Sequence, residues 1–342
     1  MMPRVTVLMP VYNVEKYVSE AINSILNQTF TDFELLILDD CSTDGTAEII
    51  RSFSDPRVRY VKQKKNVGLA DNLNTGIELS ETEYLARMDG DDISVASCLE
   101  KQIRFLDAHP EVGVCGAGFR FFGTKNDTIF FPEKNEEIKA EQLFGCGVIQ
   151  PMLRRKILID NNLRYKTSAF PAEDYRLWAE FLRVAQAHTL QEVLFHYRMH
   201  AGQISTEKRQ LQIEKSNEAR LLMLEWLSPD FSTEEKQYFI ETFVPANITK
   251  QEKWKVLKNF AQLIEQKNEK QKVFEPQALH ARLQKHINDK AYYVAVKIFF
   301  PKKFLLKNYI KFLRSDVAKD VQKNLSVKIF AKSLLRKNSY NS

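Results

Sequence analysis

The segment from Tyr84 to Ile93 constrains the fold most strongly, because a short apolar run leads directly into a turn with three carboxylates. Its first three residues, Tyr-Leu-Ala, are typical of a buried strand. Gly90 permits a sharp turn directly after that strand. The three carboxylates belong to Asp89, Asp91 and Asp92. Carboxylates this close repel one another unless a cation or water neutralises them.

Two interpretations of this acidic turn are open. Carboxylate oxygens suit Mg²⁺ or Mn²⁺, and both ions keep positions for water and phosphate oxygens. An open α/β sheet also binds its ligands just beyond the carboxyl ends of its strands. Alternatively, an aspartate here simply caps a helix. One aspartate suffices for a cap, so three of them directly after a strand favour the metal site.

Strands and helices alternate along the first part of the chain. Apolar runs predict strands at residues 5–9, 33–38, 57–62 and 84–88, and periodic patterns predict helices at 14–27, 46–54 and 69–80. Because the connections are short, this order predicts a mostly parallel sheet with helices on both faces. The expected fold class is therefore α/β.

The pattern continues less regularly and then changes near residue 205. Helices are expected at 96–109, 136–144, from 155, and at 172–186, and extended segments at 112–117, 119–123, 150–154 and 188–199. Long helical patterns rich in Lys, Glu and Gln follow at 211–227, 233–243, 250–267 and 276–290. We expect an α/β domain over residues 1–204 and a mainly α-helical domain over 205–342.

Composition favours a cytoplasmic protein. Of its 342 residues, 44% are hydrophobic and 27% are charged, which is ordinary for a globular chain. The sequence contains no run of eighteen apolar residues, and its first ten residues lack a signal-peptide pattern. The four cysteines have no paired metal-ligand spacing, which fits a reducing compartment.

The last part of the chain is strongly basic. Residues 291–342 carry 12 Lys/Arg and 2 Asp/Glu, a charge of +10, which leaves −4 for the rest because the whole chain carries +6. A basic stripe and an apolar stripe recur at helical spacing after Pro301. The basic stripe contains Lys303, Lys307, Lys311 and Arg314, and the apolar stripe contains Leu306, Tyr309, Ile310 and Leu313. Such a helix either lies on an anionic membrane surface or packs on the protein with its basic face in water. We expect the first, with residues 301–342 on the inner face of the cell membrane.

Two more strand ends carry polar residues suited to a nucleotide. Tyr12 follows the first strand and can either stack on a base or pack within the protein. Asp39 and Asp40 follow the second strand and can either accept hydrogen bonds from a base or ribose or serve the turn. Taken with the acidic turn, three strand ends place polar ligands on one rim, which is far more specific than any one alone.

The chain resembles the family-2 glycosyltransferases. The motifs that carry the resemblance are Met-Pro-Val-Tyr-Asn (9–13), Ser-Ile-Leu-Asn-Gln-Thr-Phe (24–30), Asp-Asp-Cys-Ser-Thr-Asp-Gly-Thr (39–46), Asn-Val-Gly-Leu-Ala (66–70), Arg-Met-Asp-Gly-Asp-Asp-Ile (87–93) and Glu-Asp-Tyr-Arg-Leu-Trp (173–178). They occur in the family's order and cover roughly residues 4–204. The resemblance implies a GT-A fold and an inverting transferase that uses a nucleotide-diphosphate sugar, often a UDP-sugar.

The resemblance also implies roles for individual residues. By position, Pro10 and Tyr12 would line the base pocket, Asp40 would contact the base, and Asp39 would support the nucleotide site. Asp89 would reach the sugar or ribose, and Asp92 would support the loop. Asp91 matches the metal-binding aspartate of the Asp-X-Asp motif, and His200 lies in a segment like the one that closes on diphosphate and Mn²⁺ or Mg²⁺. Arg198 could pair with phosphate or be a surface cation.

Asp174 matches the family's catalytic base, and Glu173 precedes it. A carboxylate within hydrogen-bond reach can take the proton of an attacking hydroxyl. By themselves, these two residues would read as an acidic pair favourable to a helix N-terminus. Gln150 stands nearest to where relatives often carry an Asn or His beside the acceptor. We therefore leave the acceptor contacts open.

The expected task is transfer of a hexose from a UDP-sugar to a saccharide or lipid-linked saccharide, in bacterial capsule, exopolysaccharide or lipopolysaccharide biosynthesis. A metal-dependent nucleotidyltransferase is the rival enzyme, but it should carry a glycine-rich basic loop where residues 10–13 read Pro-Val-Tyr-Asn. A non-catalytic nucleotide-sugar-binding module would lack a base or a metal ligand, and both Asp174 and Asp91 are present. The acidic body and the lack of interleaved aromatic residues in the tail disfavour nucleic-acid binding.

Overall fold

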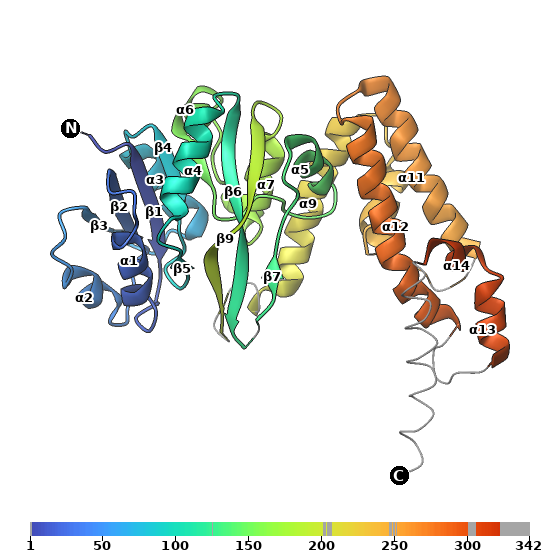
Figure 1. Ribbon diagram of the computed structural model, residues 1–342, viewed down its shortest axis with the longest axis horizontal. Coiled ribbons are helices and arrows are strands. Elements are labelled where there is room, and N and C mark those ends of the chain that lie inside the picture. The colour runs from blue at the N-terminus through green and yellow to red at the C-terminus, as the bar shows by residue number, and fades with distance from the viewer. Residues whose placement is uncertain are drawn as a thin grey trace, which may run out of the picture. The chain divides into compact units, whose positions relative to one another are not determined.

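The computed structural model describes residues 2–124, 126–200, 203, 207–245, 248, 250, 252–299 and 306–321. The chain forms two compact units, residues 1–220 and 221–342 (Figure 1). The first unit contains the sheet, and the second is helical. The expected division into domains of residues 1–204 and 205–342 stays a prediction.

A mixed sheet forms the centre of the first unit. The strands run in the order β3-β2-β1-β4-β8-β6-β9-β5, and β7 pairs with β6 beside this path. Their bounds are β1 Val5–Val11, β2 Phe33–Asp39, β3 Val58–Lys62, β4 Tyr84–Arg87, β5 Ile93–Ser94, β6 Val112–Gly123, β7 Thr128–Ile129, β8 Met152–Arg154 and β9 Gln186–Met199. The first four strands pair in parallel, as predicted, whereas β8 is antiparallel to both β4 and β6.

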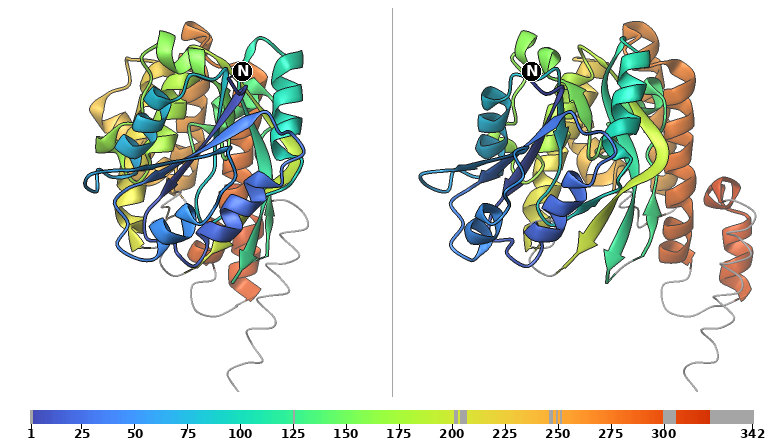
Figure 2. Two further views of the ribbon diagram at one scale, coloured as in Figure 1. Left: turned by 90° about the vertical axis from the view of Figure 1, so that its left-hand side faces the viewer. Right: turned by 60° about the vertical axis from the view of Figure 1, so that its left-hand side comes forward.

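Helices cover both faces of this sheet. The helices of the first unit are α1 Val18–Leu26, α2 Thr46–Arg51, α3 Leu69–Leu79, α4 Cys98–Ala108, α5 Asn135–Glu141, α6 Arg155–Asp160 and α7 Glu173–Phe181, with a 3₁₀ turn at Thr167–Ala169. The helix α9, Arg209–Leu227, begins in this unit and continues into the next. Figure 2 shows α3 and α4 on opposite sides of the sheet.

The alternation of side chains along β1 explains these layers. Val5, Val7 and Met9 point to the face where the apolar sides of α1, α2 and α4 complete one buried cluster. Leu8 points to the other face, toward α3. There Gly76 lets α3 approach closely, because a Cβ atom at this position would lie 2.9 Å from Leu8 Cδ2. The burial of both faces therefore fixes β1 at the centre of the sheet.

The long strands β6 and β9 run side by side and pair in parallel (Figure 1). Residues 112–117 and 119–123 were expected as separate strands but form one strand, and its register with β9 shifts near Gly118. Phe130 lies against Gly118, where a Cβ atom would come within 2.5 Å of its ring. The far end of β9 pairs with β5, directly after the acidic turn.

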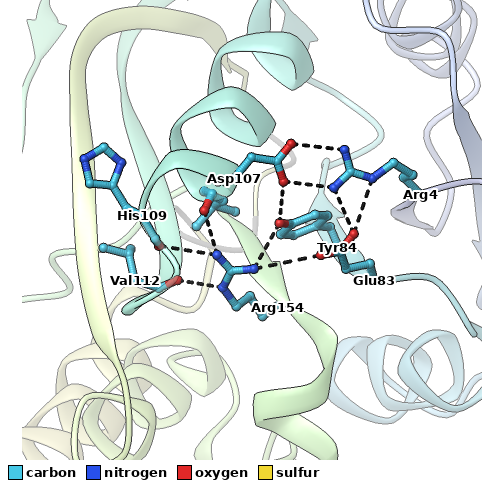
Figure 3. A network of polar contacts seen from close by, with 8 residues as sticks. Arg4, Glu83, Tyr84, Asp107, His109, Val112 and Arg154 are labelled. Carbon is cyan, nitrogen blue, oxygen red and sulfur yellow. Dashed lines mark hydrogen bonds and ion pairs between the residues drawn. The ribbon is translucent and has the colours of Figure 1, made fainter.

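A polar network lies where β1 and β4 begin (Figure 3). Arg154 of β8 donates to the carbonyls of Leu106, at 2.6 Å, and Val112, at 2.9 Å, and to the hydroxyl of Tyr84 at 3.0 Å. Its guanidinium thus adds a charged donor to the Leu106 carbonyl in the last turn of α4, which also accepts the backbone N–H of His109 at 3.1 Å. This contact joins β8 to α4 and β4.

Arg4 joins the same network from the chain segment before β1. Its guanidinium bridges Glu83 and Asp107, with N–O distances of 2.9 Å to each (Figure 3). Asp107 also accepts a hydrogen bond from Tyr84 at 2.8 Å. These ion pairs are partly exposed and contribute modestly to stability.

The second unit packs helices around aromatic side chains. Its helices are α10 Thr233–Tyr238, a π-helical turn at Phe239–Phe243, α11 Glu252–Gln271, α12 Pro276–Phe299, α13 Leu306–Leu313 and α14 Asp316–Asp320. Trp254, Phe239 and Phe243 are fully buried. His286 donates its Nε2–H to the carbonyl of Phe243 at 2.9 Å, and burial lowers the pKa of His286 to about 3.

Part of the basic tail lies outside the described residues, including Lys303 and all of 322–342. In α13, Phe312 is buried within its unit, whereas Ile310 and Leu313 are 42% and 52% exposed. Lys311 and Arg314 are exposed as well. Among the helices that the structure describes, none combines the length and the apolar character needed to cross a membrane.

Candidate active site

A cleft of about 840 Å³ opens at the carboxyl ends of β1, β2 and β4 in the first unit. Most of the residues singled out from the sequence lie on its walls. These are Pro10, Tyr12, Asp40, Asp89, Asp91, Asp174 and His200. Asp39 and Arg198 do not line the cleft. The roles expected of all nine residues stay predictions, and the geometry below says what each can reach.

One end of the cleft combines an exposed aromatic ring with a buried carboxylate. Tyr12 is 49% exposed, which leaves a ring face free for a ligand, whereas Asp40 is only 4% exposed. Asp40 accepts hydrogen bonds from the backbone N–H groups of Val67 at 2.7 Å and Gly68 at 2.9 Å. Burial raises the pKa of Asp40, and these two bonds oppose the rise. The carboxylate keeps lone pairs for a further donor, such as a base N–H.

Asp39 lies beneath this end, fully buried. It accepts a hydrogen bond from the Tyr60 hydroxyl at 2.6 Å and one from the Ser42 backbone at 2.7 Å. Lys62 lies 3.8 Å away and balances part of its charge. Asp39 therefore fixes the turn that carries Asp40 and does not itself face the cleft.

The acidic turn meets the end of β9 at the middle of the cleft. Asp91 Oδ2 lies 3.0 Å from His200 Nε2. Asp92 is 1% exposed and accepts the backbone N–H of Arg198 at 2.8 Å. Burial, together with Asp91 and Asp89, raises the pKa of Asp92 well above its usual range. Asp92 thus joins the turn to β9, while Asp91 faces the cleft.

Arg198 sits behind this pair. Its guanidinium donates to the Asp91 carbonyl at 2.7 Å and pairs with Glu20. The ring centres of Tyr17 and Phe122 lie 4.9 Å and 4.4 Å from the guanidinium carbon of Arg198. In this arrangement Arg198 braces the acidic turn, and a direct contact with phosphate would require the side chain to move.

Asp91 and His200 fit a divalent cation of the kind the resemblance implies. Within the described residues, no group of three or more His, Cys, Asp or Glu side chains could hold a metal ion alone. Mg²⁺ and Mn²⁺ commonly take one or two protein ligands and complete their shells with water and phosphate oxygens. One carboxylate and one imidazole at the wall of an open cleft match that requirement.

Arg87 links the acidic turn to the next wall of the cleft. Arg87 is the last residue of β4 and forms an ion pair with Asp89, with an Nε–Oδ1 distance of 3.0 Å. Glu173 and Asp174 act on the same guanidinium electrostatically, and with Asp89 they keep the pKa of Arg87 well above its usual range although burial opposes this. One buried cation therefore stabilises three carboxylates around the cleft.

Glu173 and Asp174 occupy the first turn of α7, where the helix dipole favours negative charge. Burial raises the pKa of Asp174, and Arg87 opposes the rise. Burial and the neighbouring Asp174 raise the pKa of Glu173 to about 7. Glu173 Oε2 has no hydrogen-bond partner among the described residues. Two coupled carboxylates with raised pKa values at a cleft are suited to proton transfer.

Sequence reasoning did not single out several residues of the cleft. Gln150, noted as the nearest candidate for the acceptor side, does line it and lies 3.4 Å from Asp92. Arg87 could have been found from the sequence, because it is a cation next to an acidic motif at a strand end. Part of the wall also comes from Lys208, directly before α9, and from Gln212, Ser216 and Arg220 within that helix. Their sequence carries no recognisable motif, so only the fold brings them to the site.

Known proteins are similar to this chain in sequence. Residues 6–161 match the family model described as glycosyl transferase family 2. The chain is 33% identical over 203 residues to the Bacillus subtilis glycosyltransferase EpsE, which covers 57% of this chain and 73% of that protein. It is 28% identical over 226 residues to Escherichia coli WfaP, named UDP-Glc:alpha-D-GlcNAc-diphosphoundecaprenol beta-1,3-glucosyltransferase, covering 63% and 85%.

A solved structure supports the same fold. The crystal structure of Staphylococcus aureus TarS 1–349 in complex with UDP-GlcNAc superposes with a TM-score of 0.58, covering 99% of this chain and 93% of that one at 20% identity. The arrangement confirms the expected GT-A fold followed by a helical region. The ordered motifs, the family model and the relatives agree, and the chain belongs to the family-2 glycosyltransferases.

Proposed function

We propose that this glycosyltransferase moves a hexose from a UDP-sugar to an acceptor hydroxyl with inversion of the anomeric configuration. One observation carries the proposal: a single cleft brings together Tyr12 and Asp40, the Asp91–His200 pair, and Asp174. These are the groups needed to hold a nucleotide, its diphosphate and an attacking hydroxyl. The cleft volume of about 840 Å³ is within the range of small-molecule sites.

The donor would enter with its base between Pro10, Tyr12 and Asp40. The exposed ring of Tyr12 offers a stacking surface, and Asp40 offers an acceptor held in place by the Val67 and Gly68 N–H groups. The name of WfaP, which uses UDP-Glc, and the UDP-GlcNAc bound to TarS both support a UDP-sugar. Asp89, adjacent to the diphosphate side, would meet the sugar or ribose.

The diphosphate would lie beside Asp91 and His200, the two residues that would hold Mn²⁺ or Mg²⁺. A bound divalent ion would neutralise the negative charge that grows on the leaving nucleoside diphosphate. Asp91 and His200 orient this part of the site through their own contact, and Arg198 and Asp92 hold them from behind.

Asp174 would act as the base. An acceptor hydroxyl attacks the anomeric carbon from the face opposite the leaving group and must lose its proton. The raised pKa of Asp174 increases its affinity for that proton, and Arg87 keeps the charged form accessible. A single displacement with one base and no covalent intermediate inverts the anomeric centre.

The acceptor is proposed to be a saccharide, carried on a lipid in a bacterial surface-polysaccharide pathway. The printed name of WfaP, which acts on a lipid diphosphate-linked sugar, supports this class. Cytoplasmic UDP-sugars and a membrane-bound acceptor would place the enzyme at the inner face of the membrane. Contact with anionic lipid there is supported by exposed Ile310, Lys311 and Leu313 in α13 and by exposed Arg314 directly after it.

Nucleotide release tests the central activity. UDP-glucose, UDP-galactose and their N-acetyl forms are screened with and without Mn²⁺, alongside Asp174→Asn. The proposal expects Mn²⁺-dependent UDP release with at least one of these donors and strong loss in the variant. Release that does not require a divalent ion, or none from any UDP-sugar, contradicts it.

Sedimentation with liposomes tests the membrane contact. At low salt the full chain should bind vesicles with an anionic lipid and leave neutral ones unbound, since each basic residue near such a surface contributes about 1 kcal/mol. Binding should fall as salt rises, because screening shortens the range of the attraction. If the full chain does not bind anionic vesicles at low salt, its basic face lies in water and the proposed membrane contact is wrong.

A further inference from the structure

One wall of the cleft comes from one side of α9 and the residue directly before it. Lys208 precedes the helix, and Gln212, Ser216 and Arg220 follow within it at intervals of four residues. Residues at this spacing occupy one side of a helix. The face therefore runs from Lys208 along α9 to Arg220.

Direct contacts fix this face relative to Asp174. Gln212 Nε2 donates to the carbonyl of Pro171 at 3.2 Å, three residues before the base. Arg220 Nε donates to the carbonyl of Phe144 at 2.9 Å. A movement of α9 would thus disturb the loop that carries the base, so the helix and the base form one unit of the site.

The face has the chemistry of a sugar-binding surface. The Phe170 ring is partly exposed at the cleft, and Lys208 Nζ lies 4.7 Å from its centre. In the described part of the chain, the Ser216 hydroxyl has no hydrogen-bond partner and Lys208 has no carboxylate partner. Aromatic surface beside unused hydroxyl and ammonium groups suits a ligand with apolar ring faces and many hydroxyls.

We propose that this face of α9, with Phe170, is the acceptor subsite and binds a saccharide. The inference rests on the proposed function, since it needs Asp174 as the base and the donor at Tyr12 and Asp40. Those groups leave the α9 side of Asp174 for the acceptor. A sugar lying along Gln212 and Ser216 would present a hydroxyl toward the first turn of α7.

Two substitutions test the subsite without touching the donor groups. Ser216→Leu places a larger apolar side chain on the wall, and Leu is favourable within a helix. Ser216→Ala removes only the hydroxyl and keeps a residue favourable within a helix. Glu214→Gln is the control, because Glu214 is exposed on the same helix and does not line the cleft. Circular dichroism and thermal melting confirm that each variant is folded.

The assay measures UDP release from the preferred UDP-hexose, first in water alone and then with octyl β-glycosides of glucose, galactose and N-acetylglucosamine as acceptor probes. Calorimetry gives the Kd of UDP. Ser216→Leu and Ser216→Ala should raise the KM for the accepted glycoside about tenfold, the effect of losing one good hydrogen bond. Release in water and the Kd of UDP should stay within about twofold, and Glu214→Gln should match the wild type.

Unchanged acceptor KM in both variants overturns the subsite. A wild-type enzyme that releases UDP in water but is accelerated by none of the glycosides overturns it as well, and leaves the donor site intact. If the enzyme neither binds UDP nor releases it, the proposed function fails and the subsite fails with it. The three failures are therefore distinguishable.

Discussion

The imidazole of His200 lies 3.0 Å from the carboxylate of Asp91, although 109 residues separate them along the chain. The pairing of β5 with the end of β9 brings these two residues together, since β5 begins directly after the acidic turn. The Arg198 contacts with Asp91 and Asp92 hold the same junction. The position of the proposed metal site is thus set by the register of two strands.

Asp91→Asn should abolish metal-dependent transfer. The amide keeps the shape of the side chain but removes the negative charge that favours a divalent ion, and such an ion supplies several kcal/mol of transition-state stabilisation. Calorimetry should show that Mn²⁺ no longer strengthens UDP binding. Asp160→Asn, an exposed aspartate on α6, is the control. A variant at Asp91 that keeps wild-type transfer, or a wild type fully active in EDTA, would exclude the site.

Asp40→Ala should weaken UDP binding by about 1–3 kcal/mol, the cost of losing a buried hydrogen bond to the ligand. The variant also leaves the Val67 and Gly68 N–H groups without their acceptor. Folding must therefore be checked by thermal melting before calorimetry. Asp32→Ala, an exposed aspartate that does not line the cleft, provides the comparison. Equal UDP affinity in a folded Asp40→Ala protein would remove this residue from the nucleotide site.

Glu173 should make the free energy of unfolding depend on pH. Burial raises the pKa of Glu173 in the folded protein to about 7, whereas the ordinary pKa of a glutamate is 4.5. Between these values the unfolded chain binds fewer protons, so the free energy of unfolding falls as pH rises through this window. Urea denaturation of Glu173→Gln should show a weaker fall between about pH 4.5 and 7. An identical pH dependence in both proteins would contradict the raised pKa.

Arg154→Met should lower the free energy of unfolding by about 2–3 kcal/mol, because the carbonyls of Leu106 and Val112 and the hydroxyl of Tyr84 lose a charged hydrogen-bond donor. The network lies at the end of the sheet opposite the cleft, so the remaining folded enzyme should keep its Kd for UDP. Arg104→Met, an exposed arginine on α4, should change stability by less than about 0.5 kcal/mol. The urea midpoint measures both effects, and equal midpoints would contradict a supporting role for Arg154.

The sequence predicted the parallel core of the sheet because local patterns determine it. Buried runs such as Val5 to Met9, followed by amphipathic helices with short connections, leave few topologies. The acidic turn and Asp40 could be placed for the same reason, since each follows a strand directly. The strand ends of a parallel sheet meet at one edge, and the cleft lies there.

Other features depend on long-range packing that no local pattern records. The bulged pairing of β6 with β9 makes one strand where two were expected, and Gly118 lies at the irregularity, against the Phe130 ring. By its sequence Arg198 could pair with phosphate or be a surface cation, and only the fold brings the rings of Tyr17 and Phe122 against it behind the acidic turn. Arg87 gains its importance only when α7 brings Glu173 and Asp174 beside it.

The account depends most directly on Asp174 as the base. Asp174→Asn keeps the shape of the side chain and removes its basicity, and loss of general-base catalysis typically lowers a rate by about 10²–10⁴-fold. The decisive measurement pairs the transfer rate of this variant with its Kd for UDP and with the NMR anomeric configuration of the wild-type product. We predict a loss of that size, an unchanged Kd and an inverted anomer. Near-normal transfer by Asp174→Asn, or a retained anomer, would contradict the mechanism.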